Sequence, residues 1–180
     1  MTTSLVIVAI LAAVNPFVAA SAAGPRAVPL RVVLSGTALS IAAYSLMAAF
    51  AGEIVDWLGV EPESFRLAAG IVMAVSGAAT IVLGAPARSV DWHHPLADLF
   101  PLGVPLLLSP AGMAAVVTTA ASEGAPGTVA VVLAVLAAAA LLLLGRAGRA
   151  GHAMDGLARL LAGILVAIGV ALGIDGIRSV

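Results

Sequence analysis

Long stretches without a charged residue are the feature of this sequence that most restricts its fold. Five of them are as long as a membrane-crossing helix, at 1–25, 32–52, 67–87, 99–122 and 124–145. A helix needs about 20 apolar residues to cross the hydrocarbon core of a bilayer. Charged residues make up 9% of the chain, against about 25% in soluble domains. The sequence therefore predicts an all-α integral membrane protein.

A sixth charge-free stretch, 160–174, is shorter, but it becomes long enough to span if Arg159 extends toward the lipid headgroups. Six transmembrane helices are predicted, and with no linker or charged block between them they form a single transmembrane domain, 1–180. The apolar run at 5–14 resembles a signal-peptide core. No Lys or Arg precedes it, so we expect this segment to remain as the first helix.

The two halves of the chain resemble each other. The heptapeptide FRLAAGI at 65–71 returns as ARLLAGI at 158–164, and Asn15-Pro16 returns as Ser109-Pro110. These matches define repeat 1 as 1–84 and repeat 2 as 95–176. Because three crossings are an odd number, the second repeat enters the membrane upside down. The predicted fold is a 3+3 inverted repeat with broken helices 1 and 4, a plan used by many secondary transporters.

The arginines predict the orientation in the membrane, since every basic residue except the three histidines is Arg. Arg66 and Arg178 fall on one side. The other six fall on the opposite side, namely Arg26, Arg31, Arg88, Arg146, Arg149 and Arg159. Arg-rich loops face the cytoplasm by the positive-inside rule. We therefore predict a multi-pass protein of the cell inner (plasma) membrane with both termini outside.

The prolines of the first and fourth helices indicate a substrate site. Pro16 and Pro110 cannot donate a main-chain hydrogen bond, so we expect them to free the carbonyls of Ala12 and Leu106. Freed polar groups survive in a membrane only where protein or a polar cavity satisfies them. The predicted substrate-binding residues here are Asn15, Pro16, Ser109, Pro110 and Gly112. Ordinary proline kinks are the alternative, and the recurrence in both repeats favours the site.

Four further residues are candidates. Ser40 and Tyr44 are four residues apart on one face of the second helix, so they either line the pathway or hydrogen-bond to neighbouring helices. Arg66 and Arg159 occupy matching positions in the two repeats. They act either as gates at the two mouths or as anchors paired with nearby carboxylates.

The composition argues against several other functions. The chain has no cysteine, which excludes thiol and disulfide chemistry, and a net charge of −1 with scattered arginines gives no nucleic-acid surface. His93, His94 and His152 lack further ligands at metal-site spacing. No acid, base or nucleophile pair falls in the central turns of the spans. We expect no enzyme activity, no bound metal and no cofactor.

With the two repeated motifs, the string PLGVPLLLSPAGM at 101–113 makes the chain resemble the MarC family of six-helix inner-membrane proteins. The resemblance implies a lysine-exporter-like superfamily with a 3+3 inverted repeat and, in one branch, transport of small neutral amino acids such as glycine and alanine. Phe17 and Val18 stand where the family motif has a glycine and a polar residue, and Ser109 stands where it has a glycine. These departures imply a tighter and more apolar site.

We therefore expect a secondary membrane transporter of small neutral solutes, such as small amino acids, working by alternating access around a midplane site. The alternative is a passive channel or a non-transporting membrane scaffold protein. The expected partners are a small-molecule substrate and the lipid bilayer. Sodium on freed carbonyls, or a proton on Asp98 or Glu53, is a candidate coupling ion, and the sequence is compatible with a homo-oligomer.

Overall fold

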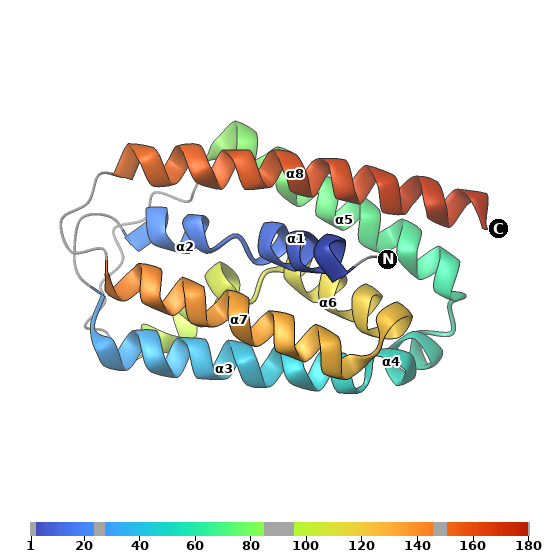
Figure 1. Cartoon of the computed structure of the whole chain (residues 1–180), viewed down its shortest axis with the longest axis horizontal. Coiled ribbons are helices and arrows are strands. Elements are labelled where there is room, and N and C mark those ends of the chain that lie inside the picture. The colour runs from blue at the N-terminus through green and yellow to red at the C-terminus, as the bar shows by residue number, and fades with distance from the viewer. Residues whose placement is uncertain (1–2, 24–27, 85–95, 146–150, 180) are drawn as a thin grey trace.

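The structure is a computed structural model that describes residues 3–23, 28–84, 96–145 and 151–179. All regular secondary structure in these ranges is helical. Most helices run along one long axis, and the start of α1 lies toward the same end of the bundle as the end of α8 (Figure 1). The elements are α1 (Thr3–Val14), α2 (Pro16–Ala23), α3 (Leu30–Ala49), α4 (Ala51–Leu58), α5 (Pro62–Leu83), η1 (Asp98–Leu107), α6 (Pro110–Glu123), α7 (Ala125–Leu144) and α8 (Gly151–Arg178).

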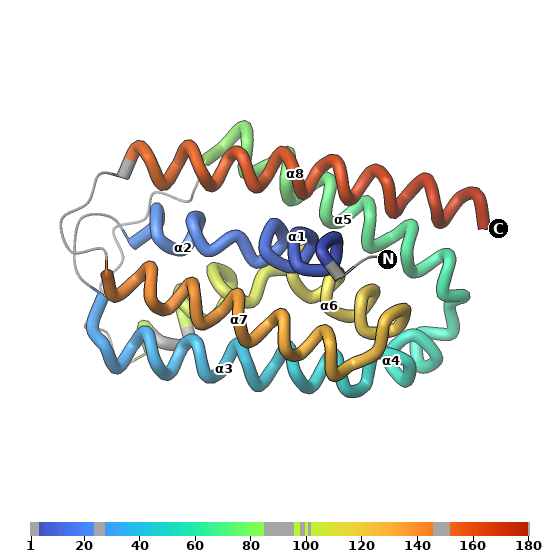
Figure 2. Tube along the Cα trace, in the orientation of Figure 1, coloured from blue at the N-terminus to red at the C-terminus, as the bar shows by residue number. Residues whose placement is uncertain are grey.

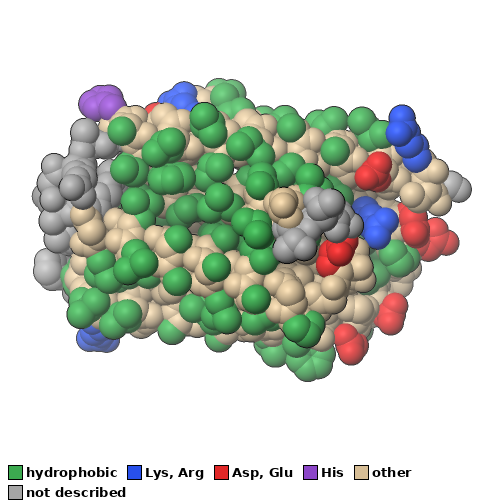
Figure 3. Space-filling model, in the orientation of Figure 1, with side chains coloured by type: hydrophobic (Ala, Val, Ile, Leu, Met, Phe, Trp, Pro, Cys, Tyr) green, Lys and Arg blue, Asp and Glu red, His purple; other side chains and the backbone are tan. Residues whose placement is uncertain are grey.

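Helices of membrane-crossing length dominate the bundle. In the described ranges five are long and apolar enough to span, namely Ser4–Ala23 (α1 with α2), Leu30–Ala49, Pro62–Leu83, Ala125–Leu144 and His152–Arg178. Large apolar side chains point outward, with Val82 76%, Leu83 79% and Leu141 71% exposed. Figure 3 shows apolar side chains over the middle of one face and charged side chains toward its two ends. This surface is suited to lipid rather than water.

The predicted fourth span differs from the other five. The stretch 99–122 is divided between η1 and α6, and the backbone of Phe100 and Val104 inside η1 is extended rather than helical. Both residues precede a proline, whose ring clashes with a helical conformation of the residue before it. Helix α6 has 14 residues, about 21 Å of helix. A sixth crossing is therefore not among the five candidate spans and stays a prediction.

The last helix is longer than its charge-free stretch suggested, because α8 covers 28 residues. Helices α5 and α8 are antiparallel and pack closely through glycines. A Cβ atom added to Gly70 would lie 2.5 Å from the carbonyl oxygen of Gly169, and one added to Gly77 would lie 2.7 Å from that of Ala162. Such contacts leave room only for glycine, so they fix how α5 and α8 lie against each other.

A short helix, α4, follows α3 and covers part of the gap between the charge-free stretches 32–52 and 67–87. Its side chains Ala51 and Val55, four residues apart, are buried, whereas Trp57 is exposed. The helix ends at Gly59, which has a φ of 64°. This left-handed conformation is one that glycine adopts without steric cost, and it commonly closes a helix.

Four of the arginines that predict the orientation lie outside the described ranges, namely Arg26, Arg88, Arg146 and Arg149. His93 and His94, which were considered as metal ligands, also lie outside these ranges. The side chain of Asp98 also lies outside the description. The orientation in the membrane therefore stays a prediction.

Candidate functional site

Helices α1 and α2 are separated by a single residue, Asn15 (Figure 2). Asn15 has a φ of 44°, in the left-handed region that asparagine tolerates better than most residues. The Asn15 N–H still donates to the carbonyl of Leu11 at 2.9 Å, and the carbonyl of Asn15 accepts from the N–H of Val18 at 2.9 Å. Pro16 then starts α2 at a position where no N–H is needed. The chain thus turns at Asn15 and resumes its helix at once.

A second interruption lies between η1 and α6, at Leu108 and Ser109. Ser109 is extended, and its hydroxyl oxygen accepts a hydrogen bond of 3.0 Å from the N–H of Gly112. This is the usual N-cap arrangement, in which a side-chain oxygen satisfies a free N–H of the first helical turn. Pro110 follows as the first residue of α6, where its fixed φ suits a helix.

One hydrogen bond joins the two interruptions, and Tyr44 forms two more at the second of them. The hydroxyl of Ser109 donates to the carbonyl of Ala13 at 3.0 Å, and the hydroxyl of Tyr44 donates to the carbonyl of Leu107 at 2.8 Å. Tyr44 also accepts a bond of 3.2 Å from the N–H of Ser109. Ala13 lies two residues before Asn15, and Leu107 lies two residues before Ser109. The prolines were expected to free the carbonyls of Ala12 and Leu106. The carbonyls that accept a hydrogen bond from a hydroxyl group are those of the next residues, Ala13 and Leu107.

Asn15 is buried, and its side chain is only half satisfied. Its Nδ2 donates a bond of 2.8 Å to the carbonyl of Ala158 in α8. Its Oδ1 has no hydrogen-bond partner among the described residues. A buried amide oxygen without a partner costs free energy, so this atom is available to a ligand group that can donate.

The structure brings some of the predicted site residues together and leaves others apart. Tyr44, Ser109 and Gly112 are in contact, and a Cβ atom on Gly112 would overlap the Tyr44 hydroxyl. The space above Gly112 is therefore filled by a side chain of the protein. Ser40 is buried, and its hydroxyl donates a hydrogen bond of 2.9 Å to the carbonyl of Gly36 on the same helix.

The two matched arginines lie in different environments. Arg159 forms an ion pair of 2.9 Å with Asp155 and donates to the carbonyl of Ile81 at 2.8 Å, which ties α8 to the end of α5. Arg66, toward the opposite end of α5, makes no ion pair or hydrogen bond with the described residues. It lines a cavity instead. Arg159 is thus paired with a carboxylate, whereas Arg66 has no such partner in the part of the chain that the structure describes.

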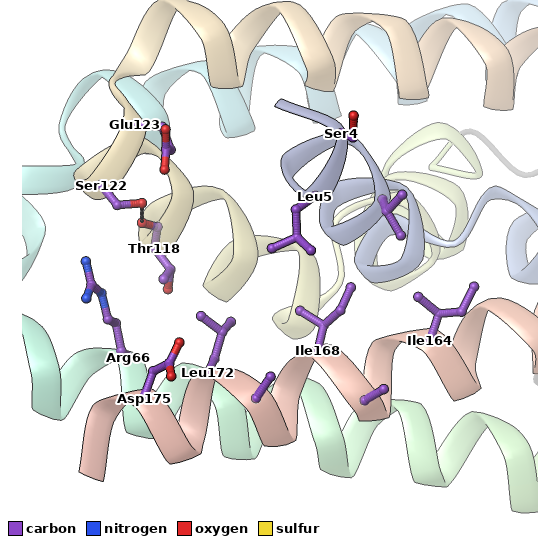
Figure 4. A pocket seen from close by; sticks show the side chains of 13 residues that line it. Ser4, Leu5, Arg66, Thr118, Ser122, Glu123, Ile164, Ile168, Leu172 and Asp175 are labelled. Carbon is purple, nitrogen blue, oxygen red and sulfur yellow. Dashed lines mark hydrogen bonds between the residues drawn. The ribbon is translucent and has the colours of Figure 1, made fainter. Parts of the chain in front are cut away.

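The cavity beside Arg66 has a volume of about 850 Å³ and lies between α1, α5, α6 and α8. Figure 4 shows side chains from all four helices pointing into it. A second, smaller space of about 170 Å³ shares Arg66, Thr118 and Ser122 and is bordered by α4. Neither space is lined by Asn15 or Ser109. The larger one is lined by Ser4, Leu5, Val8, Arg66, Thr118, Ser122, Glu123, Ile164, Ala167, Ile168, Ala171, Leu172 and Asp175.

Sequence reasoning did not find this cavity, although it named Arg66. In the sequence, Thr118 is one polar residue within the charge-free stretch 99–122, and Asp175 is the residue that follows the stretch 160–174. Both residues line the cavity because α6 and α8 each pack on α1 and on α5, an arrangement that no local sequence pattern reports. Comparison with protein-family models, curated proteins and solved structures gives no match to this chain. The resemblance to the MarC family therefore stays a prediction.

Proposed function

We propose that the protein is a secondary transporter of small neutral solutes, such as small amino acids, that works by alternating access in the cell inner membrane. The observation that carries this proposal is the relation between the cavity and the helix interruptions. The cavity lies at the end of the bundle where α5 begins, and along α1 and α8 its lining extends as far from that end as Val8 and Ile164. The Asn15–Ala158 contact lies beyond them on the same two helical stretches.

The distance between the cavity and this contact is short. Val8 and Asn15 are seven residues apart, which is roughly 10 Å at about 1.5 Å per helical residue. Ile164 and Ala158 are six residues apart, which is roughly 9 Å. A solute in the cavity would thus stand about two helical turns from the buried Oδ1 of Asn15. This arrangement is expected of a carrier that is open at one end and closed at its centre.

The packing of the helices supports an inverted repeat of six crossings. Helix α5 packs on α8 and α3 on α7, so two helices of the first half lie on their counterparts in the second, while α1 contacts both its counterpart α6 and α8. The α5–α8 pair is antiparallel, since Gly70 lies near Gly169 and Gly77 near Ala162. In this proposal η1 and α6 together form the fourth crossing, and Asn15 and Ser109 mark the broken helices. The two repeats then rock about the fixed centre.

The different environments of the two arginines also support alternating access. Arg66 and Arg159 occupy matching positions, yet Arg159 is tied to Asp155 and Ile81, while Arg66 lines a cavity and has no partner among the described residues. In a carrier with two inverted states, matched residues exchange environments when the protein switches. The end with Arg66 would be the open, outer one, and Arg159 would face the cytoplasm.

The chemistry of the centre favours a neutral zwitterion. The Oδ1 of Asn15 is an acceptor without a partner among the described residues, and the N-terminus of α6, whose Gly112 N–H is capped by Ser109 in this conformation, provides a positive dipole end. An ammonium group can donate to the Asn15 Oδ1, and a carboxylate is attracted by the positive N-terminus of α6. No charged side chain takes part in the hydrogen bonds of Asn15, Tyr44 or Ser109. A strongly cationic or anionic solute would therefore lack a counter-charge.

Uptake of labelled glycine and alanine into proteoliposomes, under sodium, proton and exchange conditions, tests the proposal. Asn15→Ala should raise the half-saturating concentration roughly 5- to 100-fold, because losing a buried hydrogen bond costs about 1–3 kcal/mol. Ser35→Ala is the matched control, since the Ser35 hydroxyl bonds only to its own helix at Arg31. Linear flux without saturation would indicate a channel. No flux under any condition would indicate a scaffold protein.

A further inference from the structure

The wall of the cavity that α8 provides has an apolar part and a charged end. Ile164, Ile168 and Leu172 follow one another at intervals of four residues, so they form a stripe along one face of the helix. Asp175 comes three residues later on the same face, and its carboxylate points into the same space (Figure 4). The helix therefore presents an aliphatic surface that ends at an anion.

Arg66 supplies the opposite charge. It extends from α5 toward α6, as Figure 4 shows, and no described residue pairs with it. Asp175 lines the same cavity, but the two side chains form no ion pair with each other. Glu123 also lines the cavity and is engaged in another interaction. A cation and an anion that share a cavity without pairing leave room for a ligand that carries both charges.

A third polar group points to a ligand independently. Thr118 is only 5% exposed, and its Oγ1 has no hydrogen-bond partner among the described residues. It lines both the large cavity and the small one. Because a buried hydroxyl without a partner is costly, this atom indicates a place where a bound group or a water supplies the missing bond.

The size of the space argues for more than the smallest solutes. About 850 Å³ is within the 300–1,000 Å³ that small-molecule sites usually occupy. Glycine or alanine would leave the stripe formed by Ile164, Ile168 and Leu172 without contact. A branched aliphatic side chain would cover it and gain the free energy of removing apolar surface from water.

We propose that this cavity binds a free amino acid with an aliphatic side chain of about the size of leucine. The carboxylate lies on the Arg66 guanidinium, which is suited to paired hydrogen bonds with a planar anion. The ammonium lies toward Asp175, and Thr118 completes the polar contacts. The side chain lies along Ile168 and Leu172. This inference takes its substrate class, amino acids, from the proposed transport function and narrows it.

Equilibrium binding of labelled leucine to the full-length protein in nanodiscs tests the proposal without a gradient. With the unaltered protein, leucine should bind at least 10-fold more tightly than alanine, than leucinamide, which lacks the carboxylate, and than 4-methylpentanoate, which lacks the ammonium. Equal binding of leucinamide or alanine would overturn the proposal. Tighter binding of 4-methylpentanoate would also overturn it and would indicate a site for a lipid-like anion.

Two variants and a matched control locate the site. Arg66→Gln should weaken leucine binding at least 10-fold, and Thr118→Val, which keeps the shape of the side chain, about 5-fold. Arg178→Gln removes an exposed arginine near the end of α8 that does not line the cavity, and binding should not change. Unchanged binding by folded Arg66→Gln protein would overturn the proposal.

The outcomes separate this inference from the proposed transport function. Binding of leucine with the expected variant pattern, without flux in proteoliposomes, would support the cavity and contradict transport. Saturable flux of glycine or alanine, without leucine binding, would support transport and contradict the cavity site.

Discussion

The hydroxyl group of Ser109 donates a hydrogen bond of 3.0 Å to the main-chain carbonyl of Ala13, and this bond joins the two places where a helix is interrupted. The same hydroxyl accepts from Gly112 and so caps α6. One side chain thus satisfies a free acceptor in the first half of the chain and a free donor in the second. In a membrane, where water does not replace such bonds, this pairing keeps both interruptions at the centre of the bundle.

Replacing Ser109 with alanine should destabilise the protein. Ser109→Ala removes the cap of α6 and leaves the Ala13 carbonyl without this partner, at an expected cost of about 1–3 kcal/mol. Ser35→Ala is again the matched control, because the Ser35 hydroxyl bonds only within its own helix. Thermal unfolding in detergent should show a lower midpoint for Ser109→Ala alone. Equal midpoints for the two variants would contradict the bridging role.

Tyr44 should act together with Ser109. Tyr44→Phe leaves the Leu107 carbonyl and the Ser109 N–H without the phenolic partner, so a loss of about 1–3 kcal/mol is expected. Because the two residues share one network, the effects of Tyr44→Phe and Ser109→Ala should not add in the double variant. Additive losses in unfolding experiments would show that the two hydroxyls act independently.

The close packing of α5 on α8 gives a third prediction. Gly70→Ala forces a methyl group against the backbone of Gly169 and should cost about 1–3 kcal/mol. Gly163 occupies the matching position in the second repeat and has no atom within 4 Å of an added Cβ. Gly163→Ala should therefore keep or slightly raise the unfolding midpoint, since alanine favours helix over glycine. Similar destabilisation by both variants would argue against this packing.

The membrane-crossing helices could be predicted from the sequence because burying a charge in hydrocarbon is costly. That rule placed α3, α5 and α7 well. It made the last helix too short, because Arg159 and Asp155 pair four residues apart and both stay within α8. It also treated 99–122 as one helix, although the prolines after Phe100 and Val104 impose an extended backbone there.

The site was less predictable than the fold. The proline motifs lie where α2 and α6 begin, next to Asn15 and Ser109, but the broken membrane-spanning helices stay a prediction. The motifs did not indicate that Ser109 would reach the Ala13 carbonyl, or that Asn15 would reach Ala158 in α8. These contacts depend on the spacing of whole helices, as does the cavity beside Arg66. A pattern along one helix carries no information on that spacing.

Alternating access should be visible as a change in distance across the cavity mouth. The chain has no cysteine, so cysteines introduced at Ser64 on α5 and Ala121 on α6, both exposed and one in each repeat, can be spin-labelled uniquely. Electron–electron distance measurements in nanodiscs should show two populations whose ratio changes when a saturating amino acid is added. One unchanged distance with and without solute would contradict movement of α6 relative to α5.

Solute counterflow in proteoliposomes tests the transport claim most directly. Vesicles are loaded with unlabelled alanine and diluted into a trace of labelled alanine, with no ion gradient. A carrier exchanges the two, so labelled alanine should accumulate transiently above its equilibrium level, and Asn15→Ala should reduce this overshoot while Ser35→Ala keeps it. A monotonic approach to equilibrium, or no uptake above protein-free vesicles, would contradict the account.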